Sequence, residues 1–182
     1  MTKTLAWAAM AAVALTLTAC GDREAASDTP AALAAPSSAT LAQSLDGSLG
    51  AIVDNAGLQG VFEGVGPYTI FAPSDAALAA SGSELSQEAN RAAAAALVRA
   101  HIVPGAITRS DISAALDGAA AGDTIEMRTM ADGVLTFARD GETIVVSTPD
   151  GARANLVDQE TVVSNGVVQP IDAALTPPPP AA

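Results

Sequence analysis

Four two-residue turn signals divide the second half of this 182-residue chain, and they constrain its fold more than any other feature. They are Asp132-Gly133, Asp140-Gly141, Asp150-Gly151 and Asn165-Gly166. Such pairs favour tight hairpin turns because glycine adopts a positive φ freely. The runs between them have the length and composition of strands. The sequence therefore predicts antiparallel strands at residues 124–130, 134–139, 142–148, 152–157, 161–164 and 167–169.

The first half of the chain has a helical period instead. Leu41, Leu45, Leu49 and Ile52 recur at helical spacing, which predicts one helix that ends near Gly57. The further elements expected are a helical turn at 58–62, a strand at 67–71, a short helix from Ser74 through Ala80, and an Ala-rich helix from Ser86 towards Ala100. Helices that precede antiparallel strands indicate an α+β fold rather than alternating βαβ units.

Composition excludes several kinds of chemistry. One His and one Cys cannot form a Cys/His zinc site, and one Cys cannot close an internal disulfide. The only lysine is Lys3, so no phosphate-binding P-loop and no Schiff-base lysine follows it. The acidic residues lack the spacing of a calcium-binding loop, which favours a solvated acidic surface over a metal site. We expect no cofactor, no metal and no enzymatic activity.

The N-terminus has the pattern of an export signal. Lys3 precedes an uncharged apolar stretch from Leu5 to Leu17, which is shorter than the roughly 20 residues of a membrane span. Residues 17–20 (LTAC) resemble the lipobox of bacterial lipoproteins. The resemblance implies that residues 1–19 are removed as a signal peptide and that Cys20 receives a diacylglycerol with palmitate-type chains. The alternative is an ordinary signal peptide in which Cys20 has no role.

The composition of residues 20–40 predicts a disordered tether. They contain mainly Ala, Ser, Thr, Pro and a few charges, and Leu33 is their only large apolar side chain. Residues 177–182 form a Pro-rich tail, which leaves one domain at 41–176. Without residues 1–19 the chain has 7 Arg and 20 acidic residues, a balance of -13. Anionic headgroups repel so acidic a protein, so we expect the lipid alone to hold it at the membrane.

Three segments of the domain resemble the fasciclin (FAS1) family. They are residues 66–78 (GPYTIFAPSDAAL), 98–105 (VRAHIVPG) and 165–175 (NGVVQPIDAAL), in the order that the family has them. The resemblance implies a β-sandwich or wedge with helices packed against it. It also implies a role in adhesion or cell-surface interaction. The chain departs from the family pattern at Ala100, where the family has the Tyr linked to integrin-type adhesion, and at Gln169, where it has His.

Two residues of the domain are candidate interaction or structural residues. His101 is the only side chain that titrates near neutral pH unperturbed. It follows an apolar helix without a nucleophile motif, so a hydrogen bond to a neighbour or to helix carbonyls is favoured over catalysis. Asp75 falls in the first turn of a predicted helix, where the dipole favours an anion, and this role is favoured over that of a general base.

Together these features predict an envelope lipoprotein whose FAS1 domain binds an unidentified envelope or surface protein. We expect the domain in the periplasm or at the cell surface, and Gly21 after the acylated cysteine favours the outer membrane. Nucleic acid is not an expected partner, since aromatics make up 3% of residues and basic residues are few. The alternative is a module that binds an apolar or lipid-like ligand between sheet and helices. The oligomeric state stays open.

Overall fold

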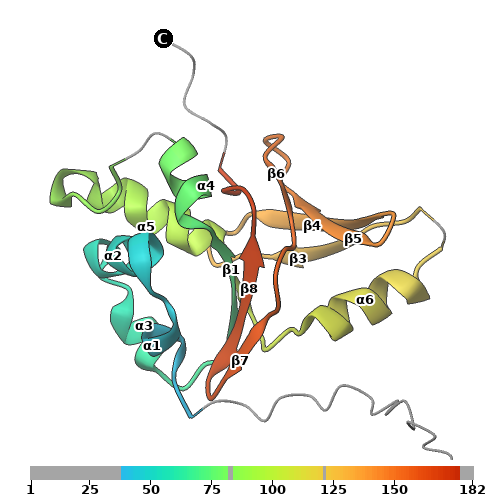
Figure 1. Cartoon of the computed structure of the whole chain (residues 1–182), viewed down its shortest axis with the longest axis horizontal. Helices are drawn as coiled ribbons and strands as arrows, with labels where there is room; N and C mark the ends of the chain where they lie inside the picture. Colours follow the sequence, from blue (N-terminus) through green and yellow to red (C-terminus); the bar gives the residue numbers. More distant parts are fainter. Residues whose placement is uncertain (1–37, 82–83, 121, 177–182) are drawn as a thin grey trace, which may run out of the picture. The chain divides into compact units, whose positions relative to one another are not determined.

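The structure is a computed structural model that describes residues 38–81, 84–120 and 122–176. The predicted signal peptide, Cys20, residues 20–37 of the predicted tether and the tail at 177–182 lie outside the described residues. The described part combines helices with two four-stranded sheets (Figure 1). The predicted α+β class is therefore confirmed.

The first half of the domain is mainly helical. Its elements are α1 (Leu41–Ser44), α2 (Gly47–Ala56), α3 (Gln59–Glu63), β1 (Tyr68–Pro73), α4 (Asp75–Ala80), the 3-10 turn η1 (Glu88–Asn90) and α5 (Arg91–Ala100). The predicted single helix over 41–56 is wrong, because Leu45 is extended and Gly47 has a φ of 63°. The break lets α1 and α2 each bury a leucine, and Gly57 ends α2 with a φ of 70°, as predicted.

The predicted helix start at Ser86 is also wrong. The regular helix begins at Arg91, after η1. Asn55 of α2 donates its side-chain amide to the carbonyls of Leu85 and Gln87, at 2.6 and 2.7 Å. These bonds hold the segment against α2, and the amide of Asn90 reaches the carbonyl of Gln87 three residues before it, as in a 3-10 turn.

Sheet A runs through the middle of the domain in the order β2-β1-β8-β7. The strands that join β1 are β2 (Ile102–Pro104), β7 (Thr161–Val163) and β8 (Gly166–Ile171). β1 and β8 pair in parallel, from Tyr68 opposite Gly166 to Pro73 opposite Ile171. No partner was predicted for the strand at 67–71, and β2 was not predicted at all, whereas the predicted antiparallel pairing of β7 with β8 is confirmed.

Sheet B is antiparallel throughout and has the order β3-β4-β5-β6. Its strands are β3 (Ile125–Arg128), β4 (Val134–Asp140), β5 (Thr143–Ser147) and β6 (Arg153–Asn155). The turns between them fall at the predicted Asp-Gly pairs, where Asp132, Gly141 and Gly151 have positive φ. Helix α6 (Arg109–Gly118) was not predicted, because only Ile112 and Leu116 mark its apolar face.

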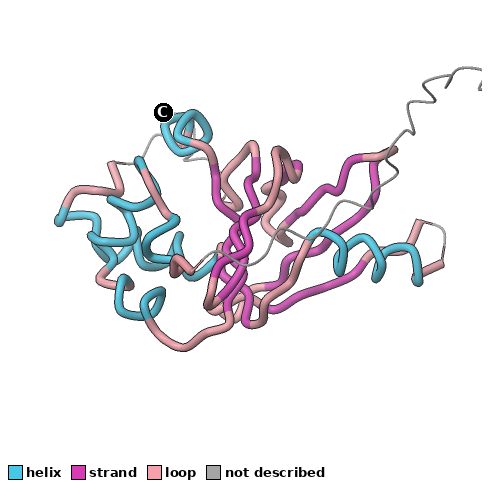
Figure 2. The backbone as a smooth tube through the Cα atoms, turned by 60° about the horizontal axis from the view of Figure 1, so that its bottom comes forward, coloured by secondary structure: helices cyan, strands magenta, loops and turns pink. Residues whose placement is uncertain are grey.

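Sheet A is covered on both faces. Along β1, Ile70 packs with Phe62 and Val98 in the cluster beneath the helices. The next residue, Phe71, faces the other way and packs against Phe137 of β4, with ring centroids 5.2 Å apart and the rings tilted by 45°. In Figure 2 most helical residues lie to one side of the strands, and α6 lies on the other side. Sheet A is thus the central layer between two apolar clusters.

Candidate functional site

Asp75 joins the starts of two helices. It is the first residue of α4, which Ser74 caps by accepting a hydrogen bond from the amide of Ala77 at 3.2 Å. The Asp75 Oδ1 atom also accepts a hydrogen bond from the amide of Ser48, in the first turn of α2, at 2.9 Å. Hydrogen bonds from the Ser48 backbone and side chain hold the pKa of Asp75 below its usual value. The group is therefore a carboxylate at neutral pH, as an anion beside two helix N-termini should be.

We expect Asp75→Ala to lower the melting temperature of the domain by a few degrees, because the first turn of α2 loses its acceptor. Asp75→Asn should retain most of the stability, since an amide oxygen can still accept from Ser48. Thermal unfolding followed by circular dichroism measures the effect. Asp54→Ala, which removes an exposed carboxylate from α2, is the control. Equal melting temperatures for Asp75→Ala and Asp54→Ala would contradict the capping role.

His101 lies in the interior and links three segments. Its Nδ1 atom is 2.8 Å from the carbonyl oxygen of Leu97 in α5, and its Nε2 atom accepts a hydrogen bond from the amide of Leu175 at 2.9 Å. The Nδ1 atom therefore carries the proton of a neutral imidazole. The carbonyl of His101 accepts from the amide of Phe71 in β1. Burial lowers the pKa of His101 to about 4.

The structure does not bring the candidate residues into one site. Asp75 is exposed at the surface, whereas His101 is fully buried. Cys20 lies outside the described residues. Within residues 38–81, 84–120 and 122–176, no group of three or more His, Cys, Asp or Glu side chains is placed to hold a metal ion. Ala100, where the family has tyrosine, is the half-buried last residue of α5.

Asn165 is a buried residue that was predicted to lie in a turn and that opens the third FAS1-like segment. Its Oδ1 atom accepts from the amide of Leu41 at 2.8 Å, and its Nδ2 atom donates to the carbonyls of Phe62 and Gly64 at 2.7 and 2.8 Å. Its own carbonyl accepts from the amide of Tyr68. One side chain therefore satisfies the polar ends of α1 and α3 at the turn between β7 and β8.

Gln169 forms a second buried polar network. Its side-chain amide donates to Glu160 and to the carbonyl of Ile107, and its Oε1 atom accepts from Arg109 at 3.3 Å. The Arg109 guanidinium also donates to the carbonyls of Val157 and Asp158. This network fastens the start of α6 to sheet A. A polar residue inside the apolar run of β8 was the sequence signal for it.

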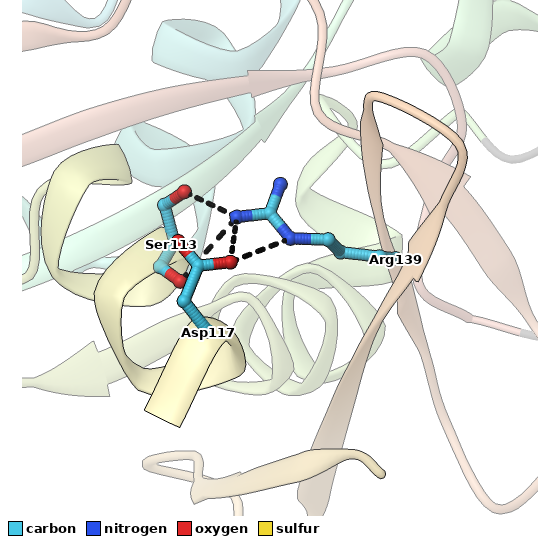
Figure 3. Close-up of polar contacts among 3 residues, drawn as sticks. All are labelled: Ser113, Asp117 and Arg139. Carbon is cyan, nitrogen blue, oxygen red and sulfur yellow. Dashed lines mark hydrogen bonds and ion pairs between the residues drawn. The ribbon is translucent and has the colours of Figure 1, made fainter. Parts of the chain in front are cut away.

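Arg139 of β4 contacts Ser113 and Asp117 of α6 at the surface (Figure 3). It donates through Nε and Nη2 to one oxygen of Asp117, at 3.1 and 2.7 Å, and through Nη2 to the hydroxyl of Ser113 at 2.6 Å. Both partners lie on α6, so the contact ties this helix to β4. Exposed ion pairs stabilise proteins by about 0–1 kcal/mol. We therefore interpret this contact as a modest structural link between β4 and α6.

Two surface hollows border α4. One has a volume of about 490 Å³ and is lined by Asp75, Ser48, Ile52 and Leu85. The other has a volume of about 400 Å³ and lies between Ala80, Ala152 and Ala174, with Arg153 and Asp172 at its border. Both are open surface features, while the space between sheet A and the helices is filled by packed apolar side chains.

None of the helices in the described segments is both long enough and apolar enough to cross a membrane.

Comparisons with known proteins point to one family. The chain matches the family model of the Fasciclin domain over residues 47–177. Protein sll1483 of Synechocystis sp. is 29% identical over 136 residues, which cover 72% of this chain and 67% of that protein. A solved FAS1 domain pair from the insect cell adhesion molecule Fasciclin I superposes with a TM-score of 0.55 at 24% identity. That match covers 69% of this chain and 42% of the domain pair, so the chain spans less than half of its length.

Proposed function

The chain belongs to the fasciclin domain family, and on that basis we propose that it is a lipid-anchored protein of the bacterial envelope whose domain binds another protein. The domain acts as a rigid scaffold that presents its surface, and it catalyses no reaction.

One observation carries the binding role: the buried polar side chains are engaged in holding the fold. His101, Asn165 and Gln169 direct their hydrogen bonds to backbone groups or to neighbouring side chains. An enzyme needs such groups in a pocket, within reach of a substrate. The origin of the solved FAS1 pair in a cell adhesion molecule also supports protein contact.

The open hollows favour a protein partner over a small apolar ligand. Ligand pockets usually enclose most of the ligand surface. Here the apolar side chains between sheet and helices pack on one another, and both hollows described above lie at the surface. A native mass spectrum of the purified domain distinguishes the two functions. A co-purified lipid-like mass would favour the ligand, whereas the mass of the bare chain supports a protein-binding module.

The lone Cys20 after Leu17-Thr18-Ala19 supports the anchor. Acyl chains contribute about 0.8 kcal/mol per buried CH₂, so more than one chain holds a protein stably. Electrostatic attraction to the membrane cannot replace the lipid. Without residues 1–19 the chain has 7 Arg and 20 acidic residues, so anionic lipid repels it. Gly21 favours placement in the outer membrane.

We expect Cys20→Ala to abolish lipid attachment and to move the protein out of the membrane fraction. The sulfur that would carry the diacylglycerol is then absent. Labelling of a bacterial host with radioactive palmitate, followed by membrane fractionation, measures both effects. Ser27→Ala, in the predicted tether, should leave label and fractionation unchanged. A Cys20→Ala protein that stays labelled and membrane-bound would overturn the anchor proposal.

The protein-binding role is tested with immobilised chain that lacks residues 1–19 and carries Cys20→Ser. A specific partner should be retained from envelope extracts at physiological salt. The same chain with Asn165→Asp, which we expect to be unfolded, should not retain it. Retention of the same proteins by both baits would argue against a folded binding surface.

A further inference from the structure

We propose that the exposed edge of β3, at residues 125–128, pairs with the same edge of a second copy of this chain. The result is a two-fold symmetric dimer in which the two B sheets form one continuous antiparallel sheet. This inference concerns self-association and does not depend on the partner proposed above.

The hydrogen-bond pattern shows which residues of β3 face outward. β3 is the outermost strand of sheet B, and Arg128 lies opposite Val134 of β4. The next residue, Thr129, donates its amide to the carbonyl of Gly133 at 2.9 Å, which directs it towards β4. Hydrogen-bonding direction alternates along an antiparallel strand. The amides and carbonyls of Glu126 and Arg128 therefore point away from the sheet.

A second contact gives the same direction independently. The amide of Met130 donates to the carbonyl of Ile102 in β2 at 2.9 Å, so Met130 also directs its amide away from β4. Glu126, Arg128 and Met130 are two residues apart and share this orientation. The end of β2 lies beside this part of β3, but Arg128 has no backbone hydrogen bond to it, and Pro104 has no amide hydrogen to donate.

The edge of β3 has unused hydrogen-bonding capacity. Glu126 and Arg128 are exposed. Within the described segments, neither their outward backbone groups nor their charged side chains have a hydrogen-bond or ion-pair partner. An unpaired edge of this kind is a template for another strand.

The other outer strands of the two sheets each have a hydrogen bond along or beside the outer edge. The amide of Ser164, next to β7, donates to the carbonyl of Ala39 at 2.9 Å. Asn155 of β6 donates its amide to the carboxylate of Asp172 at 2.7 Å. Residues 126–128 of β3 have no such contact, and they present two exposed side chains of opposite charge.

Charge complementarity selects a second copy as the occupant. Antiparallel registers that pair the outward groups of two β3 strands place Glu126 opposite Glu126, Arg128 opposite Arg128, or Glu126 opposite Arg128. The third register opposes unlike charges at both positions, and each such pair exchanges two main-chain hydrogen bonds. The other two registers oppose like charges, which destabilises strand pairing.

The same register matches the apolar face of the strand. The two-fold axis passes beside Met127, so Met127 of one copy faces Met127 of the other. Ile125 and Met127 are half-buried and lie on the face that packs against the second apolar cluster. Pairing would cover the part of these side chains that solvent now reaches, which adds an apolar contribution to the main-chain bonds.

Sedimentation equilibrium on a chain with Cys20→Ser and without residues 1–19 tests the proposal. Both apolar clusters lie within residues 41–175, so this chain retains the complete described core. At about 0.15 M salt, which limits repulsion between the acidic copies to roughly 8 Å, we expect a concentration-dependent monomer–dimer equilibrium. A chain that is monomeric at every concentration up to the millimolar range would overturn the proposal.

Charge reversal tests the register. Glu126→Arg and Arg128→Glu should each weaken the dimer at least tenfold, because like charges then face each other. The double exchange should restore dimerisation, and an equimolar mixture of the two single variants should form a heterodimer. Glu142→Arg makes the same charge change at the exposed β4–β5 turn and should have no effect. A single reversal that leaves the dimer unchanged would exclude this register.

A cross-link gives a separate readout. In the Cys20→Ser background, Met127→Cys provides a single cysteine at the two-fold axis, where facing Cα atoms are about 4.5 Å apart. This separation permits a disulfide. Mild oxidation should yield a covalent dimer with Met127→Cys and not with Glu142→Cys. Equal cross-linking of both variants would indicate random collision and would contradict the proposed pairing.

Discussion

Asn165→Asp is expected to unfold the domain or to lower its free energy of unfolding by about 3 kcal/mol or more. The substitution hardly changes the size of the side chain. It removes the two donors that reach the carbonyls of Phe62 and Gly64, and it places a negative charge beside those oxygens. The residue is 7% exposed, so water cannot replace the lost bonds. Urea unfolding at neutral pH measures the loss.

The neighbouring residue provides the control for Asn165. The exposed Ser164 donates its hydroxyl to the carbonyl of Ala39 at 2.9 Å. Ser164→Ala should cost no more than about 1 kcal/mol, since Ser164 is exposed and the carbonyl of Ala39 still accepts from the Ser164 amide. If both variants had the same small effect, the tie from Asn165 to α1 and α3 would not be important for stability.

The second large effect is a loss of stability on mild acidification. The pKa of His101 is about 4 in the folded chain because the ring is buried, against an ordinary value of 6.5. Below pH 6.5 the unfolded chain binds a proton that the folded chain does not yet accept. The contribution of neutral His101 to the free energy of unfolding is therefore fully present above pH 6.5. It is lost progressively as the pH falls to 4, by about 3 kcal/mol in total.

This pH window can be assigned to one residue because the chain contains one histidine. The pKa values of Asp75 and Asp111 are lowered from 3.8 by hydrogen bonds from Ser48 and Thr108, so the stability they contribute is lost only at more acid pH. Urea unfolding between pH 7.5 and 4.5 measures the effect. His101→Gln should be less stable at pH 7.5 but nearly independent of pH over this range. A variant that kept the full pH dependence would exclude His101 as its source.

The strands of the second half were predictable because their signal is local. An Asp-Gly or Asn-Gly pair specifies a turn whatever surrounds it, and Ser74 caps α4 through a contact three residues away. The parallel pairing of β1 with β8 has no such signal, since apolar strands far apart in sequence carry no mark of their partner. Helix α6 was missed because its buried face consists chiefly of Ile112 and Leu116.

The polar residues also show that local positions were predictable from the sequence and long-range contacts were not. The place of Asp75 in the first turn of a helix was predicted, but its bond to Ser48 of α2 depends on how α2 and α4 pack. Asn165 was assigned to a turn from its glycine neighbour, and that local reading gave no indication of its three tertiary hydrogen bonds. Gln169 could have been found, because a polar residue within an apolar strand needs buried partners.

The central position of β1 and β8 determines when the chain can fold. β1 ends at Pro73 and β8 begins at Gly166, so the central parallel pair closes a loop that contains most of the domain. The N-terminal helices pack on sheet A, which is incomplete until β8 has joined it. Closing so long a loop also makes folding slow. In the export proposed above, a chain that crosses the membrane N-terminus first stays incompletely folded until residue 171 has followed. The interval before that point is when it is most exposed to proteases and to aggregation.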